Sequence, residues 1–341
     1  MESSELTNLL ERAFRARAVM IGTHKESALR LFNGFYEGCP HLVADLYART
    51  LLLHNYAESP EKGREDVETA LAWYREKMPF LRAGVLKVRS AENPAERNGV
   101  LLFGDTPDRR IREQGVAYAI DLTMNRDASF YLDTRGLRAW LHEHAAGKAV
   151  LNTFAYTGSL GVAAAAGGAS RVAQTDLNRK FLNLAKDSYT LNGLPIRRED
   201  FISGDFWQVV SRLKRAGEQF DGVILDPPFF AATEAGRVDL NECPERVINK
   251  VRPLVKDGGW LVAINNALFV SGQEYLRTLE TLCVDGYLGV ENLIPVPPDV
   301  TGFPETICSV PPADPAPFNH PTKIAVLRVR RKNTGIPAGE T

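Results

Sequence analysis

The chain has 341 residues, of which 44% are hydrophobic and 24% are charged, a globular composition that suits two domains. The 41 lysines and arginines balance 42 aspartates and glutamates, so the net charge of −1 indicates no global attraction to nucleic acid, although a local basic patch could provide one. The four cysteines form no CxxC pair, which argues against a disulfide framework or a zinc site and favours a reducing, cytoplasmic location. We find no signal-peptide core and no run suited to a membrane span, so we expect no membrane partner.

The first third of the chain predicts a helix followed by a small α+β domain. Residues 1–28 are expected to form an N-terminal amphipathic helix, because Leu6, Leu9, Leu10 and Phe14 recur at helical spacing. Residues 29–120 contain short strand patterns and one helix, Glu65–Glu76, and could bind the substrate. Val100–Phe103 and Val116–Asp121 are expected to pair as a hairpin-like link to the next domain. Candidate RNA-binding arginines are Arg109, Arg110 and Arg112, followed by Arg12, Arg15 and Arg17, for which a solvated face of a packed helix is the preferred alternative.

Residues 121–332 alternate regularly between strand and helix patterns, which predicts a mostly parallel sheet covered on both faces. Residues 333–341 are expected to form a flexible tail. The strands are expected at Ala149–Phe154, Arg171–Thr175, Phe201–Asp205, Phe220–Leu225, Trp260–Asn265, Leu293–Val296 and Thr322–Val329. The helices are expected at Gly136–Ala146, Leu160–Ala166, Asn178–Asn192, Phe206–Arg215, Glu245–Val255 and Gly272–Cys283. A proline-rich rim loop is expected over Pro295–Pro321.

The stretch from Ala149 to Asp176 contains a strand, a small-residue turn, a helix and a second strand that ends in an acid. The acid lies at the distance from Gly158 that suits a carboxylate holding ribose hydroxyls. The glycines do not have the GxGxxG spacing that a pyrophosphate requires. An adenosine ligand without phosphates is therefore favoured, and S-adenosylmethionine is the leading candidate. A βαβ unit with no nucleotide site is the alternative.

Three acids, Asp176, Asp205 and Asp226, are each predicted at the carboxyl end of a strand, where ligands bind in open α/β sheets. Asp226 begins the tetrapeptide Asp226-Pro227-Pro228-Phe229, which is the sharpest local signal. Its prolines fix the backbone and leave carbonyls free to accept hydrogen bonds, and its aromatic ring could stack on a flat base. A strand-ending turn with one capping acid is the structural alternative.

In these stretches the sequence resembles the class I S-adenosylmethionine-dependent methyltransferases of the large-subunit rRNA group, of the RlmI and RlmK type. The resemblance implies a Rossmann-like domain with a mostly parallel seven-stranded sheet, preceded by a small α+β domain. Some members begin with a separate PUA domain, which we do not expect in this chain. The resemblance rests on Phe130 to Arg135, Leu151 to Ser159, Asp176, Leu191-Asn192-Gly193, Asp205 and Phe220 to Phe230.

The resemblance also implies roles for individual residues. One segment before the strand Ala149–Phe154 would close over the cofactor, and the loop after that strand would contact it. Asp176, followed by Leu177, would hold the ribose, and Asp205 would hold the adenine amino group with Phe206 beside the ring. The target atom would be positioned by Asp226, Pro227, Pro228 and Phe229. The closing segment supplies Tyr131, Asp133 and Arg135, and the loop supplies Phe154, Tyr156 and Gly158.

One departure bears on the chemistry. Members that methylate carbon 5 of cytosine place a nucleophilic cysteine after the strand that corresponds to Trp260–Ile264, whereas this chain has Asn265-Asn266 there. The paired asparagines resemble the members that methylate a guanine ring nitrogen, so Asn265 joins the catalytic candidates. Cys243 is the alternative nucleophile.

We therefore expect an S-adenosylmethionine-dependent methyltransferase that acts on a base nitrogen of rRNA and needs no metal. Its oligomeric state is left open. A methyltransferase of a small molecule or a protein side chain is the first alternative, because one fold hosts many substrates. A non-catalytic RNA-binding or assembly module is the second.

Overall fold

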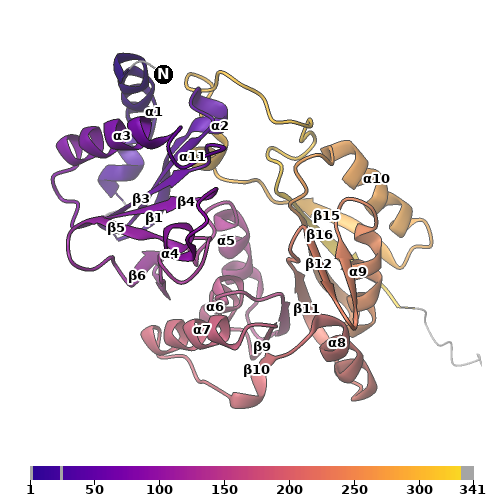
Figure 1. The fold of residues 1–341 in the computed structure, drawn as a ribbon. Helices are drawn as coiled ribbons and strands as arrows, with labels where there is room; N and C mark the ends of the chain where they lie inside the picture. Colours follow the sequence, from indigo (N-terminus) through magenta and orange to yellow (C-terminus); the bar gives the residue numbers. More distant parts are fainter. Residues whose placement is uncertain (1–2, 24–25, 332–341) are drawn as a thin grey trace, which may run out of the picture.

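The computed structural model describes residues 3–23 and 26–331, which contain two main sheets (Figure 1). The flexible tail expected at residues 333–341 lies outside the described residues. None of the helices in the described part of the chain is long and apolar enough to cross a membrane.

The first sheet has five strands in the order β1-β2-β3-β4-β5, and all neighbours are antiparallel except β3 and β4. Helices α1 (Ser3–Thr23) and α3 (Arg64–Lys77) pack on one face, where Leu6, Leu10 and Ala13 of α1 are fully buried. The helix expected to reach residue 28 is described only as far as Thr23, and Ala28 already belongs to a strand. The strands are β1 (Ala28–Asn33), β2 (Leu42–Tyr47), β3 (Thr50–Asn55), β4 (Ala83–Val88) and β5 (Val100–Phe103).

The second sheet has seven strands in the order β10-β9-β8-β11-β14-β16-β15. The first five are parallel, and β16 runs antiparallel to both of its neighbours. The predicted mostly parallel seven-stranded sheet is thus confirmed. The strands are β8 (Ala149–Thr153), β9 (Arg171–Asp176), β10 (Phe201–Ser203), β11 (Phe220–Leu225), β14 (Val255–Asn265), β15 (Leu288–Leu293) and β16 (Lys323–Val329).

Helices cover both faces of the second sheet, because alternate residues of each buried strand are apolar on either side. One face packs against α5 and α6, with α7 beside them, and the other face packs against α8, α9 and α10. The longer helices are α5 (Arg135–His144), α6 (Ser159–Ala166), α7 (Arg179–Leu191), α8 (Phe206–Arg215), α9 (Pro244–Val251) and α10 (Gly272–Cys283). Short helices are α2 (Gly34–Glu37), α4 (Pro94–Asn98), α11 (Pro298–Thr301), η1 (Arg198–Asp200) and η2 (Arg252–Leu254).

The structure differs from the sequence prediction in four places. The segment Val100–Phe103 does not pair with Val116–Asp121; it extends the first sheet as β5, beside β4. The hairpin partner of β7 (Val116–Ala119) is β6 (Arg110–Glu113), whose short, polar pattern gives little strand signal. The strand expected at Leu293–Val296 lies earlier, as β15, because the prolines that follow cannot donate to a ladder. A further hairpin, β12 (Phe230–Thr233) with β13 (Gly236–Asp239), was not predicted.

Asp299 of α11 joins the two sheets. Its fully buried carboxylate accepts two hydrogen bonds from Arg135 of α5, at 2.6 and 3.0 Å, and one from the backbone N–H of Arg30 in β1, at 3.0 Å. Its backbone carbonyl accepts a hydrogen bond from Arg17 at 2.8 Å, and Arg17 pairs with Glu37 at 2.9 Å. Arg17 is therefore buried in this joint and cannot contribute to an RNA-binding surface.

Replacing Asp299 should destabilise the whole protein. Asp299→Ala leaves buried Arg135 without its main partner, which should lower the free energy of unfolding by about 3–5 kcal/mol. Urea unfolding measures the change, and Glu305→Ala, an exposed acid on the same segment, is the matched control. A loss below about 1 kcal/mol for Asp299→Ala would contradict the role given to this joint.

Candidate active site

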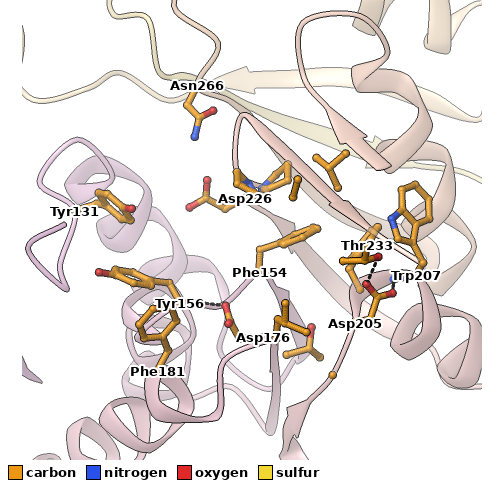
Figure 2. A pocket seen from close by; sticks show the side chains of 18 of the residues that line it. Tyr131, Phe154, Tyr156, Asp176, Phe181, Asp205, Trp207, Asp226, Thr233 and Asn266 are labelled. Atoms are coloured by element: carbon orange, nitrogen blue, oxygen red, sulfur yellow. Dashed lines mark hydrogen bonds between the residues drawn. The ribbon is translucent and has the colours of Figure 1, made fainter. Parts of the chain in front are cut away.

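The carboxyl ends of the parallel strands surround a cavity of about 340 Å³ (Figure 2). Asp176 ends β9, Asp205 precedes α8, and Asp226 follows β11, so the three acids predicted at strand ends all line this cavity. The cavity volume falls within the range of small-molecule sites, which is about 300–1,000 Å³. Its position at the carboxyl edge of the sheet is where doubly wound folds bind ligands.

The loop after β8 is strained and is held by Asp176. Phe154 and Tyr156 have φ angles of 52° and 51°, a left-handed conformation that side chains other than glycine adopt rarely. The backbone N–H of Tyr156 donates to Asp176 Oδ2 at 2.8 Å. Behind the loop, Gly158 has a φ of 78°, and a Cβ there would lie 2.5 Å from the side chain of Ala185. Gly158 therefore allows the turn without itself lining the cavity.

Asp176 retains the capacity to bind a diol. Its Oδ1 accepts the backbone N–H of Asn178 at 2.8 Å, so each carboxylate oxygen has one protein donor and a second lone pair to offer. Burial raises the pKa of this carboxyl. Two adjacent hydroxyl groups could donate to its two oxygens, which is the geometry that a ribose presents.

Flat aromatic walls adjoin Asp176. The rings of Phe154 and Phe206 are stacked, with centroids 4.5 Å apart and planes at 28°. Asp205 lies beside them, and its Oδ1 caps α8 by accepting the N–H of Trp207 at 2.9 Å. Its Oδ2 accepts the hydroxyl of Thr233 in β12 at 2.7 Å, so the β12–β13 hairpin is tied across this end of the cavity (Figure 2). A planar heterocycle could stack on the outer face of this ring pair, but not between the two rings.

The opposite end holds polar groups that have no protein partner. Within the described residues no N–H or O–H donates to the carboxylate of Asp226, and burial together with the charge of Asp133 raises its pKa to about 7. Asp133 itself accepts the hydroxyl of Thr322 at 2.7 Å. The side chain of Asn266 points toward Asp226 in Figure 2, and its Oδ1 is buried without a partner. Unpaired buried polar atoms are rare, so these groups indicate a ligand site.

The structure brings most of the predicted site residues together around this cavity and leaves four outside it. The four outside are Arg135, Gly158, Phe229 and Asn265. Those that line the cavity are Tyr131, Asp133, Phe154, Tyr156, Asp176, Leu177, Asp205, Phe206, Asp226, Pro227 and Pro228.

The surroundings of three of these residues explain why they lie outside the cavity. Arg135 is saturated by Asp299 and Glu113 and by the carbonyl of Ala28, so its guanidinium cannot close over a cofactor. Asn265 is fully buried, because strand alternation turns it into the core and turns the next residue toward the cavity. Phe229 is 48% exposed and lies outside the cavity.

Sequence reasoning missed several residues that line the cavity. Asn266 could have been chosen over its neighbour only with the register of the strand, which decides which face meets the cavity. Thr233 of the hairpin and Trp207 at the start of α8 both donate to Asp205, and no local pattern predicts the contact with Thr233. Phe181 and Thr322 reach the cavity from α7 and from the segment before β16.

The family model described as "S-adenosylmethionine-dependent methyltransferase" matches residues 59–301. This chain belongs to that family. The predicted family and its cofactor class are thereby confirmed.

Curated relatives extend the likeness. Two proteins called "Ribosomal RNA large subunit methyltransferase I" are each 33% identical to the chain: the Aeromonas salmonicida protein over 228 residues (66% of this chain, 57% of the relative) and the Tolumonas auensis protein over 250 residues (70% and 63%). The chain thus spans about six tenths of the length of these relatives.

Solved structures share the fold. A methyltransferase, SMU.776, complexed with SAH superposes with a TM-score of 0.84 at 22% identity, covering 96% of this chain and 82% of the other. The M. jannaschii tRNA m1G37 methyltransferase gives a TM-score of 0.54 at 18% identity, covering 85% and 75%. These likenesses show a methyltransferase fold.

The cavity residues suit this cofactor. The paired oxygens of Asp176 match ribose hydroxyls, and the walls of Phe154 and Phe206 match an adenine ring. Among the described residues no cation pairs with Asp226, so its carboxylate matches a positively charged sulfonium or ammonium group. When bound, S-adenosylmethionine supplies a methyl group already activated by the sulfonium.

Asp176 should determine cofactor affinity. Asp176→Asn removes the charge and one acceptor, which should weaken binding by about 1–3 kcal/mol, and Asp176→Ala should weaken it further because the strained Tyr156 loop also loses its support. Isothermal calorimetry with S-adenosylmethionine measures both. Asp187→Ala on the exposed face of α7 is the control, and NAD should not bind, because the glycine turn lacks the pyrophosphate spacing. Wild-type affinity in a folded Asp176→Ala variant would mean that the ribose is held elsewhere.

Asp226 should make the ligand-free protein less stable as the pH rises. Its folded-state pKa of about 7 exceeds the ordinary value of 3.8, so the folded carboxyl keeps a proton that the unfolded chain has lost, and stability falls between these two pH values. Asp226→Asn should remove this effect, giving no gain near pH 4 and a gain of about 1–3 kcal/mol at pH 8. Urea unfolding at both pH values, with Asp187→Asn as control, measures it. An equal effect at pH 4 and pH 8 would contradict the raised pKa.

Proposed function

We propose that this methyltransferase transfers a methyl group to a ring nitrogen of a base in large-subunit rRNA. The single observation that carries the proposal is the pairing of Asp226-Pro227-Pro228 with Asn266 in one cavity that contains no cysteine, although the structure describes all four cysteines of the chain. The rRNA assignment is supported by the names of the relatives that are 33% identical to the chain. An rRNA substrate also implies a cytoplasmic site of action.

The state and position of Cys243 favour nitrogen as the target atom. Methylation at a pyrimidine carbon needs a thiolate that attacks the ring. Cys243 precedes α9, does not line the cavity, and has its pKa raised by burial and then by the carboxylate of Glu245. A thiol in that state and position is a poor nucleophile. A ring nitrogen already has a lone pair and needs orientation rather than covalent activation.

The residues of the cavity suit that task. Asp226, whose carboxylate a bound sulfonium would keep ionised, can accept a proton from the base as the nitrogen gains its methyl group. The proline ring of Pro227 fixes the backbone, so that its carbonyl can orient the target. The Asn266 amide offers one oxygen and two N–H groups to a polar base edge. The aromatic end of the cavity would meanwhile hold the adenosine away from water.

The target atom can be tested with two variants. Asp226→Asn should lose at least about 100-fold in the rate of methyl transfer at saturating S-adenosylmethionine, because it removes a general base, although the cofactor should also bind more weakly without the negative charge. Cys243→Ala should retain most activity. The assay is transfer of labelled methyl to rRNA from a strain lacking the gene, with nucleoside mass spectrometry to locate the methyl group.

A covalent-trapping experiment can contradict the assignment of nitrogen as the target atom. RNA substituted with 5-fluorocytosine should form no stable adduct. An adduct that disappears in Cys243→Ala would overturn the nitrogen assignment. Methyl transfer to no RNA would favour a small-molecule or protein substrate.

A further inference from the structure

Four exposed hydrophobic side chains lie close in the chain to residues that line the cavity. The first pair directly follows Pro228, which lines the cavity, and the second pair lies two and three residues after Asn266, which also lines it. The two segments leave the sheet side by side, because they follow β11 and β14, which are adjacent parallel strands. We call these four residues the rim: Phe229 (48% exposed), Phe230 (53%), Leu268 (53%) and Phe269 (74%).

Asn265 fixes the two rim segments relative to each other. Its Nδ2 donates to the carbonyl of Leu240 at 3.1 Å, and the N–H of Leu240 donates to the carbonyl of Phe229 at 3.0 Å. Its Oδ1 accepts the N–H of Ala267 at 2.9 Å. This buried amide therefore connects both segments, which accounts for an asparagine that is close to the cavity but does not line it.

Lys323 holds the second segment from the other side. Its fully buried ammonium donates to the carbonyl of Ala267 at 2.9 Å and to that of Val270 at 3.1 Å. Leu268 and Phe269 thus project from a turn whose two ends are both anchored. Single exposed hydrophobic residues are ordinary on protein surfaces, but a group of four on an anchored frame beside a ligand cavity indicates a binding surface.

The partial burial of Asp226 indicates which form of RNA can reach the cavity. Asp226 lies partly buried among the strand ends, where a base inside a duplex cannot reach it. A target base must therefore leave its stack, which also exposes the faces of the neighbouring bases. Arg237 of β13 lies over the Phe230 ring of β12, 5.2 Å from its centroid, and also pairs with Asp239 and Glu242. Aromatic rings combined with arginine are typical of surfaces that bind unpaired nucleic acid.

We propose that the rim holds the unstacked bases that flank the target nucleotide, so that the enzyme accepts unpaired RNA and rejects duplex RNA. This inference rests on the proposed function and narrows its substrate to single-stranded or looped segments. The Leu268–Phe269 turn supplies the contact on one side of the target, and the Phe229–Phe230 segment supplies the contact on the other.

The test compares two RNA probes by fluorescence anisotropy. The probes are a fluorescein-labelled single-stranded RNA of about ten nucleotides and the same strand annealed to its complement. Phe269→Ala should weaken binding of the single strand by about 5- to 100-fold, the effect of losing one base–aromatic stack, and Phe269→Trp should restore it. Phe80→Ala, at a 39% exposed phenylalanine between α3 and β4, is the matched control. None of these changes should alter affinity for S-adenosylmethionine.

Two results would overturn the inference and can be told apart from failure of the proposed function. Equal binding of the duplex and the single strand would overturn the role proposed for the rim, even if labelled methyl is still transferred to rRNA. Wild-type binding by both Phe269→Ala and Phe230→Ala would do the same. Absence of binding to either probe at low salt, together with no methyl transfer to rRNA, would overturn the rim and the rRNA substrate together.

Discussion

The active site depends on one uncompensated carboxylate. Asp226 has no protein donor among the described residues, and the nearby charge of Asp133 makes its ionisation still less favourable. Such a group lowers the stability of the ligand-free protein, so the fold around it must be rigid enough to keep it in place. The buried strand β11 and the two prolines that follow Asp226 provide that rigidity on one side, and the anchored turn after β14 provides it on the other.

The remaining parts of the site have complementary tasks. The loop after β8 is strained at Phe154 and Tyr156, and Asp176 holds it through a hydrogen bond that still leaves lone pairs for a diol. The β12–β13 hairpin is tied to Asp205 through Thr233. One end of the cavity is thus preorganised for an adenosine, and the other keeps its unpaired charge for a cationic group and a target atom.

Local sequence patterns predicted the second sheet well, because its strands are buried on both faces and its helices have clear apolar stripes. They also placed Asp176, Asp205 and Asp226 correctly, since parallel strands bring their carboxyl ends to one edge. They did not predict the features that depend on contacts between residues distant in the chain. Arg135 is drawn away by Asp299, more than 160 residues later, and the pairing of β6 with β7 depends on packing against α7. The choice between Asn265 and Asn266 required the strand register.

The most direct test of the account is a titration of the Asp226 carboxyl carbon by NMR in three states: ligand-free, with S-adenosylmethionine and with S-adenosylhomocysteine. The account predicts a pKa of about 7 in the ligand-free protein. It predicts a clear fall with S-adenosylmethionine and a smaller fall with S-adenosylhomocysteine, which lacks the sulfonium charge. An ordinary pKa near 3.8 in the ligand-free protein, or the same pKa in all three states, would contradict the claim that this carboxylate gains its cationic partner when the methyl donor binds.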